Sequence, residues 1–456
     1  ITLSMQPASR AVGDYEPELP ALERENDIDN LFLWFYRGAS GPNDDANILY
    51  STSVGRDKIS ETILGIRKFS IPIGYEPEAG DRIIAVANMG DMSRYTTLAE
   101  IREAIAPAAW SGRTPTATAF AMASARDNDG VIMPSNDSAA ETAFVASLTI
   151  ERLAARIDLS FSPSNVDDDG LCYTTPASDK VHVTHAIPTN VMQHPSFVLK
   201  HVTDNTDEDC FSHTSVCGFE MIDDATGFPS NYVVEPSTAA KGEDSDLAVL
   251  YGATVAASIK ASDFDSATAI GSLLGDSRLV INDGGGMALV LTYANENTQH
   301  HSLADSRFAT GLMLRAEYEP AALLKADGST ADYTRGSDFY RLLPAGNNAQ
   351  PLFFATRSDA ETYRDTHGLQ SAGAIDCFTK GICYYHVWIK HRIIGQSGDD
   401  TRFPMEYGIV RNHVYRLSFN ISGPGYPHPD LVEPESIRAS IFVRPWSFRK
   451  LDETIM

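Results

Sequence analysis

Apolar and polar residues alternate in short stretches throughout the chain, and turn residues separate these stretches. A period of two places every second side chain on the same face, so such a stretch predicts a strand with one buried and one solvated face. A stretch that is apolar throughout predicts a strand buried on both faces. The predicted strands cover residues 30–36, 82–88, 148–159, 288–293, 312–318 and 415–421.

Two short segments predict helices instead. Thr97 begins a capping box with Glu100, after which Leu98, Ile101 and Ile105 line one helical face until Pro107. A second capping box begins at Ser358 with Glu361, and Gly368 ends the helix that follows. We therefore expect a mainly β fold with a few short helices.

The length of 456 residues exceeds the size at which one hydrophobic core stops growing, so we expect two domains. Residues 160–170 are rich in Ser, Pro and Asp and lack periodicity, which predicts a junction. The expected domains are residues 11–165 and residues 166–436. Strands with one wet face are typical of antiparallel sandwiches, so both domains are predicted to be β-sandwiches in tandem.

The first residues form a strand that a protease could separate from the rest. Ile1, Leu3 and Met5 alternate with polar residues, and Pro7 ends the pattern. Residues 8–14 are small and polar, so an arginine-specific protease could reach the backbone between Arg10 and Ala11. We expect residues 1–10 to be a removable propeptide strand.

The last residues offer a second alternating strand, which an aromatic pair follows. Its predicted inward residues are Ile437, Ala439, Ile441, Val443, Trp446 and Phe448. The segment before it, residues 422–436, is rich in Pro and Gly and predicts a semi-extended spacer. Such a spacer would let residues 437–456 leave their own domain and act as a donor strand for another molecule.

Composition excludes several classes of protein. Thirty-six basic against 61 acidic residues give a net charge of −25, which repels phosphate backbones and argues against nucleic-acid binding. No apolar run approaches the length of a membrane helix. The chain opens at Ile1 without a charged or apolar leader, so we expect any secretion signal to have been removed.

The sequence contains no motif that identifies an enzyme or a cofactor site. Zincin, nucleophile-elbow and phosphate-loop signatures are absent, so we predict neither catalysis nor a cofactor. Histidine pairs lack a third ligand at suitable spacing, the triglycine reads as a tight turn, and the acidic run reads as a solvated loop, so we predict no metal site. These segments are His182 with His185, His300 with His301, residues 284–286 and residues 167–170.

Five cysteines leave at least one thiol unpaired within a monomer. Cys210 with Cys217, and Cys377 with Cys383, are close enough in sequence to bridge a loop. Free thiols are an equally good interpretation, and the sequence does not choose between them.

Several segments together resemble the fimbrillins, the stalk subunits of type V pili of Gram-negative bacteria. The most specific is the GIVRNHVY run with the PW that follows it. The segments are residues 407–415, 441–446, 150–157, 381–385 and 25–35. The resemblance implies two transthyretin-like, Greek-key sandwich domains in tandem.

The resemblance also implies a function and partners. Fimbrillin precursors are exported as lipoproteins to the outer membrane, and an arginine-specific protease cuts them at a site that matches Arg10. Removal of Ile1, Leu3 and Met5 would leave a groove for the donor strand of an identical or homologous subunit. The chain would then polymerise into a cell-surface fimbrium, with tip and anchor subunits as further partners, for adhesion and biofilm formation.

Two alternatives remain open on the sequence. A tip or accessory adhesin of the same pilus would end a filament and lack the donor extension. An exported β-sandwich protein that binds or hydrolyses glycans would need a pocket with clustered aromatic residues or paired carboxylates.

Overall fold

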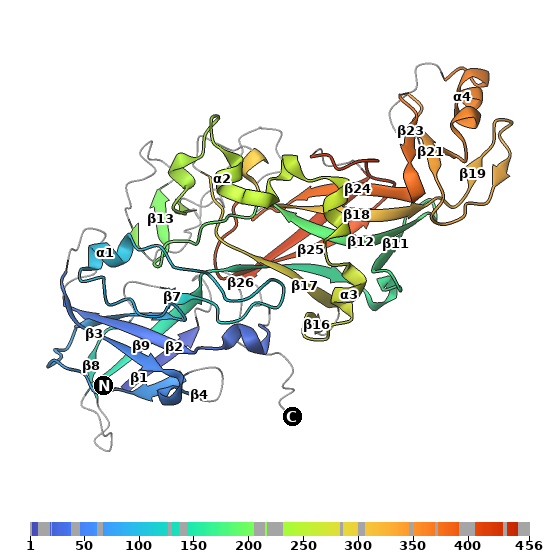
Figure 1. Ribbon diagram of the computed structural model, residues 1–456. Helices are drawn as coiled ribbons and strands as arrows, with labels where there is room; N and C mark the ends of the chain where they lie inside the picture. The colour runs from blue at the N-terminus through green and yellow to red at the C-terminus, as the bar shows by residue number, and fades with distance from the viewer. Residues whose placement is uncertain are drawn as a thin grey trace, which may run out of the picture.

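The computed structural model confirms the predicted mainly β class with a few short helices (Figure 1). In the part of the chain that the structure describes, the strands form five sheets. The described residues are 2–7, 19, 21–37, 46–61, 67–125, 130–135, 144–204, 215–216, 231–282, 286–299, 306–345, 350–369, 373–391, 406–431 and 436–445.

The first sheet has nine strands in the order β3-β2-β6-β7-β9-β1-β5-β4, and β8 pairs with β9. Its strands are β1 Thr2–Pro7, β2 Asn30–Tyr36, β3 Ile48–Gly55, β4 Ser60–Glu61, β5 Arg67–Ser70, β6 Arg82–Ala87, β7 Met122–Ser124, β8 Met133–Pro134 and β9 Phe144–Arg152.

Both faces of the first sheet are covered, which explains why β2 is apolar along its length. Leu31, Leu33 and Phe35 pack into one core, whereas Phe32 and Trp34 pack into another on the opposite face. The second of these cores includes the buried side of α1, Leu98–Arg102. The sheet is therefore held between two apolar layers.

The second and third sheets pack around one shared core, to which the inward residues of both contribute. The second sheet has the order β16-β17-β10-β25-β26, and the third has the order β11-β12-β18-β24. Their strands are β10 Ala155–Phe161, β11 Leu171–Thr174, β12 Lys180–Thr189, β16 Val280–Asn282, β17 Met287–Ala294, β18 Gly311–Glu319, β24 Ile382–Trp388, β25 His413–Ile421 and β26 Ile437–Pro445.

Two further sheets consist of short strands. The fourth, in the order β14-β13-β15, consists of β13 His201–Asp204, β14 Ser215–Val216 and β15 Asn231–Val234. The fifth, in the order β20-β19-β22-β21-β23, forms with α4 a lobe at the end of the molecule far from the first sheet (Figure 1). Its strands are β19 Leu323–Leu324, β20 Thr330–Ala331, β21 Phe339–Leu342, β22 Leu352–Phe354 and β23 Asp376–Phe378.

The observed helices agree in part with the helices predicted from the sequence. At α1 the backbone N–H of Glu100 donates to the Thr97 hydroxyl, which confirms the capping box, but the helix ends at Arg102 and Ile105 is 45% exposed. Among the described helices the longest is α4, Arg357–Thr366. The structure adds α2, Leu247–Tyr251, and α3, Ile270–Leu274.

The cap predicted for α4 was wrong by two positions, although its end was predicted correctly. Thr356 caps the helix because its hydroxyl accepts from the backbone N–H of Asp359 at 3.1 Å, while Ser358 lies inside the first turn. Gly368, with φ of +69°, ends the helix as predicted.

The strand predicted over residues 148–159 is in fact two strands in different sheets. β9 ends at Arg152 in the first sheet, and β10 begins at Ala155 in the second. The chain thus changes sheets before the predicted junction at 165/166, while the division into two tandem sandwich domains stays a prediction. Among the described helices, none has the length and apolar character that a membrane span requires.

Candidate strand-exchange site

The first strand lies in the interior of the first sheet. β1 pairs with β5 in antiparallel fashion and with β9 in parallel fashion, so both of its edges are hydrogen-bonded. Ladder bonds on two sides fix a strand more firmly than an edge position does. β1 therefore completes a sheet that later segments of the chain build.

The register places the predicted inward positions of β1 beside buried neighbours. Leu3 is paired with Phe69 on one side and Ala146 on the other, and Met5 is paired with Leu148. Phe69, Ala146 and Leu148 are at most 6% exposed. The predicted alternation thus matches the burial pattern of the neighbouring strands.

The predicted cleavage residues Arg10 and Ala11, and Ile1 at the start of the predicted displaced strand, lie outside the described residues. So do Trp446 and Phe448 of the predicted donor strand. The roles of all these residues stay predictions.

The last strand, β26, occupies the edge of the second sheet. It pairs with β25 of the same chain in antiparallel fashion from Ile437, opposite Ile421, to Pro445, opposite His413. Ile437 is 7% exposed, and the shared core is contacted by Ala439, Ile441 and Val443. The predicted alternation of these four residues is confirmed. Their donation to another molecule stays a prediction, since here they pair within their own chain.

The start of the predicted spacer is fixed to β24. The backbones of Tyr384 and Tyr426 exchange hydrogen bonds of 2.8 and 2.9 Å, and the Tyr385 hydroxyl donates to the carbonyl of Gly423 at 2.9 Å. At Gly425 a Cβ atom would lie 2.1 Å from the Tyr384 carbonyl oxygen, so only glycine allows this approach. The described part of the spacer is therefore an ordered segment rather than a loose one.

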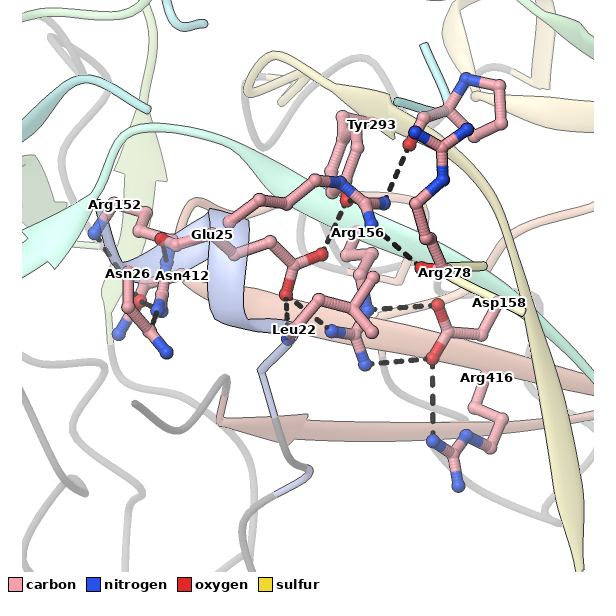
Figure 2. Close-up of polar contacts among 12 residues, drawn as sticks. Leu22, Glu25, Asn26, Arg152, Arg156, Asp158, Arg278, Tyr293, Asn412 and Arg416 are labelled. Carbon is pink, nitrogen blue, oxygen red and sulfur yellow. Dashed lines mark hydrogen bonds and ion pairs between the residues drawn. The ribbon is translucent and has the colours of Figure 1, made fainter. Parts of the chain in front are cut away.

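A buried cluster of charged residues joins the N-terminal part of the chain to the second sheet (Figure 2). Arg156 of β10 donates to Glu25 at 2.8 Å and forms a two-point pair with Asp158 at 2.9 and 3.0 Å. Arg416 of β25 reaches Asp158 at 3.4 Å, and the Tyr293 hydroxyl of β17 donates to Glu25. Glu25, Arg156 and Asp158 are fully buried, so each needs these partners.

The local backbone explains how Glu25 is held. It lies in a 3-10 helix, Glu23–Asn26, and its carboxylate also accepts from the backbone N–H of Leu22 at 2.7 Å. Burial opposes the charge of Arg156, but Asp158 and Glu25 overcome this effect and raise the pKa of Arg156. The cluster therefore holds its arginine in the charged form.

A second arginine ties the same helix to the point where the chain changes sheets. Arg152 donates to the carbonyl of Glu25 at 3.0 Å and to Asn26 at 2.7 Å (Figure 2). Asn412 accepts from the backbone N–H of Arg152 at 3.3 Å and donates its own backbone N–H to Ala154 at 2.8 Å. Burial lowers the pKa of Arg152 to about 9.

A third buried arginine fastens the segment before β25. Arg411 forms a two-point ion pair with Glu296 at 2.9 and 2.7 Å and donates to the carbonyls of Phe197 and Val198. Burial alone would raise the pKa of Glu296, but Arg411 holds it below its ordinary value.

Three of the segments that carry the sequence resemblance meet at these clusters. Glu25 comes from residues 25–35, Arg152 and Arg156 from residues 150–157, and Arg411 and Asn412 from residues 407–415. The sequence analysis named these segments but did not predict their contact. The available signal was the presence of arginines inside otherwise apolar runs.

The described cysteines settle one of the two pairings left open. Cys377 and Cys383 are both free, as is Cys172. The bridge considered between Cys377 and Cys383 is therefore not formed, whereas Cys210 and Cys217 lie outside the described residues.

Comparison with known proteins gives one match to a family and several similar structures. Residues 376–452 match the family described as major fimbrial subunit protein type IV, fimbrillin, C-terminal. No curated protein matches the chain.

Several solved structures are similar to this chain. A fimbrilin from Porphyromonas gingivalis is 16% identical, with 98% of this chain and 97% of that chain covered and a TM-score of 0.40. A putative cell adhesion protein from Parabacteroides distasonis is 13% identical, with 98% and 99% covered and a TM-score of 0.42. A tip fimbrial protein from P. gingivalis is 10% identical, with 98% and 99% covered and a TM-score of 0.37.

The family match includes β24, β25 and β26, so it falls on the part of the chain with the most specific resemblance. Residues 376–452 are thus similar to the C-terminal region of the fimbrillin family, and the resemblance predicted from the sequence is confirmed there.

Proposed function

We propose that this chain is a stalk subunit of a type V fimbria that polymerises when β1 is removed and a strand from a neighbouring subunit replaces it. The family match supports the coarser part of this proposal, a fimbrial subunit at the cell surface. The observation that carries the finer part is the position of β1. It is the first strand of the chain, yet it lies between two other strands of its sheet.

One cut after Arg10 would separate β1 from residues 11–456 and leave those residues continuous. It would expose the facing backbone edges of β5 and β9, together with the buried side chains Phe69, Ala146 and Leu148. Unpaired edges and wet apolar surface favour the addition of another strand. The groove left by β1 is therefore a site for a partner strand rather than a stable end state.

The inward residues of β26 have the spacing that this groove requires. On β9 the buried residues Ala146, Leu148 and Ile150 alternate with more exposed ones, and on β26 Ile437 and Ile441 belong to the inward face. Burial of each large apolar side chain contributes roughly 1.5 to 3 kcal/mol. Ladder hydrogen bonds contribute about 1 kcal/mol each. Both terms oppose an association cost of about 4 to 15 kcal/mol.

One observation favours a second candidate, a tip or accessory subunit of the same pilus. β26 pairs with β25 along its whole length, and its inward face packs on the core of its own chain. A subunit in which β26 remains paired with its own β25 can accept a neighbour's strand without donating one. Under the stalk proposal, β26 leaves β25 during assembly.

The experiment is electron microscopy of the full chain before and after treatment with an arginine-specific protease. We expect the parent chain to form filaments after cleavage and Arg10→Ala to stay monomeric under the same treatment. Mass spectrometry should place the cut between Arg10 and Ala11. Filaments of equal yield from both chains would contradict the proposal.

A further inference from the structure

Three side chains of metal-ligand type gather at the β11 edge of the third sheet, and none of them belongs to β1 or β26. They are Asp167, which precedes β11, Cys172 on β11 and His182 on β12. One ligand atom from each lies within 4.8 Å of the other two. The sequence analysis rejected His182 as a metal ligand because no third ligand followed from spacing alone.

The strand register explains why Cys172 and His182 meet. They are directly opposite each other in the antiparallel pair of β11 and β12. Residues opposite each other share a face of the sheet, with Cβ atoms about 4.5 to 5.5 Å apart. The pairing of β11 with β12 alone thus places the Cys172 thiol beside the His182 imidazole.

The third group is positioned by a tight turn. The Oδ1 atom of Asp167 accepts from the backbone N–H groups of Asp169 and Gly170 at 3.0 and 2.8 Å. Its Oδ2 atom is turned toward Nδ1 of His182 at 2.5 Å. Gly170 has φ of +153°, and a Cβ there would lie 2.4 Å from the carbonyl oxygen of Val183, so the turn depends on glycine.

The far side of the imidazole ring is held by a second carboxylate. Nε2 of His182 lies 3.2 Å from Oε2 of Glu319 on β18. Histidines that bind metals usually donate the other ring N–H to a carboxylate or a carbonyl, which fixes the tautomer and the ring orientation. Glu319 therefore leaves Nδ1, on the side of Asp167, as the nitrogen available for a ligand.

We propose that Asp167 Oδ2, Cys172 Sγ and His182 Nδ1 form a binding site for Zn²⁺, with Glu319 as the positioning residue. A set of one sulfur, one nitrogen and one oxygen atom suits a borderline-soft ion such as Zn²⁺ rather than Ca²⁺ or Mg²⁺. Tetrahedral bonds at Zn²⁺ lengths put ligand atoms roughly 3.3 to 3.8 Å apart. Asp167 and His182 would separate by about 1 Å to reach this spacing, and water would complete the fourth position.

Access and local charge also suit a cation. His182 is buried, whereas Asp167 and Cys172 are half-buried, so the ion could enter from the loop side. The neighbouring carboxylates of Asp169 and Glu317 are already paired with Arg335 at 2.7 and 2.9 Å. Asp167 and Glu319 thus supply the negative charge that faces His182.

A protonated His182 between Asp167 and Glu319 is the competing explanation. It accounts for both hydrogen bonds of the ring but gives Cys172 no role. The two explanations differ in whether the thiol becomes a ligand, so the test must report on sulfur.

The experiment is a titration of the chelator-treated full chain with Co²⁺ and Zn²⁺ salts alone. Bound Co²⁺ with a thiolate ligand gives a charge-transfer absorption in the near ultraviolet, and Zn²⁺ should displace it. We expect one equivalent to bind, Cys172→Ser to lose the band, and His182→Gln to bind at least about tenfold more weakly. Zn²⁺ should also raise the melting temperature of the parent chain but not that of Cys172→Ser.

Matched controls lie on the same or similar strands. His185→Gln changes the other histidine of β12, and Cys377→Ser changes another half-buried free thiol, so both should bind Co²⁺ like the parent. Replacement of Cys210 and Cys217 by serine together should also leave the band intact. Circular dichroism checks that each variant is folded. Absence of the band in the parent, its survival in Cys172→Ser, or unchanged affinity in His182→Gln would overturn the proposal.

Discussion

Arg156 of β10 and Glu25, which is 131 positions earlier in the chain, form a fully buried ion pair with an N–O distance of 2.8 Å. This pair links the helix before β2 to the sheet that contains β25 and β26. Removal of one partner from a buried pair leaves an uncompensated charge, which is strongly destabilising. The stability of the chain should therefore depend on residues that belong to neither predicted assembly strand.

The first prediction concerns this pair. Glu25→Ala removes the partner of Arg156 and of the Tyr293 hydroxyl, so we expect the chain to lose about 3 to 5 kcal/mol of stability. Glu23→Ala in the same helix is the matched control, because Glu23 is exposed. Chemical denaturation of both variants measures the difference. Equal midpoints for the two variants would mean that the pair contributes nothing net.

The second prediction concerns the core position of Met5. Met5→Asp should lower the melting temperature of the uncut chain, because its register partner Leu148 is buried and an unpaired carboxylate there costs several kcal/mol. Ser4→Asp is the control within the same strand, since its partner Ser147 is exposed. After cleavage at Arg10 both variants should melt like the cleaved parent, because the changed strand has gone. An unchanged melting curve for Met5→Asp would indicate that β1 does not complete the core.

The boundaries of several long strands could be predicted because their own side chains determine them. β2 and β25 follow from apolar runs and alternation, and the structure places them within two residues of the prediction. The break between β9 and β10 could not be predicted in this way, since residues 150–157 contain neither Gly nor Pro and read as one continuous strand. Pairing with different sheets, not local sequence, separates them.

The polar clusters could not be predicted from the sequence either, because they also depend on long-range pairing. A buried charge is stable only beside its partner, and the partners of Arg156 and His182 lie on strands and loops that meet through long-range register. Cys172 and His182 have no recognisable spacing as a motif, yet antiparallel pairing makes them direct neighbours. The cap of α4 was misplaced because Thr356 and Ser358 both precede an acidic residue by three positions.

The third prediction concerns pH. Arg411 keeps the pKa of Glu296 below its ordinary value, so this group stabilises the fold fully above the unfolded pKa of about 4.3 and loses that contribution as pH falls further. Glu296→Gln should be less stable than the parent at neutral pH, and its stability should fall less steeply below about pH 4.3. Glu243→Gln, at an exposed position, should keep the profile of the parent. Parallel acid profiles for the parent and Glu296→Gln would contradict the assignment.

The last prediction separates a donor role of β26 from a purely internal one. A chain that ends at Ser436 lacks β26, so we expect it to melt at a lower temperature, because Ile437 no longer covers the core. After cleavage at Arg10 it should still accept a strand from a neighbour but offer none in return. When it is mixed with cleaved full-length subunits, the mean filament length should therefore fall as its fraction rises.

The matched control for this experiment is the same truncated chain with Arg10→Ala. It has neither a donor strand nor an open groove, so it should leave filament length unchanged at every ratio, and it corrects for any effect of simple dilution. If the cleaved truncated chain likewise has no effect although it remains folded, β26 acts within its own subunit and the tip role is favoured. If only the cleaved truncated chain shortens the filaments, a strand located beyond Ser436 is the donor, because the two chains differ only in whether the groove left by β1 is open.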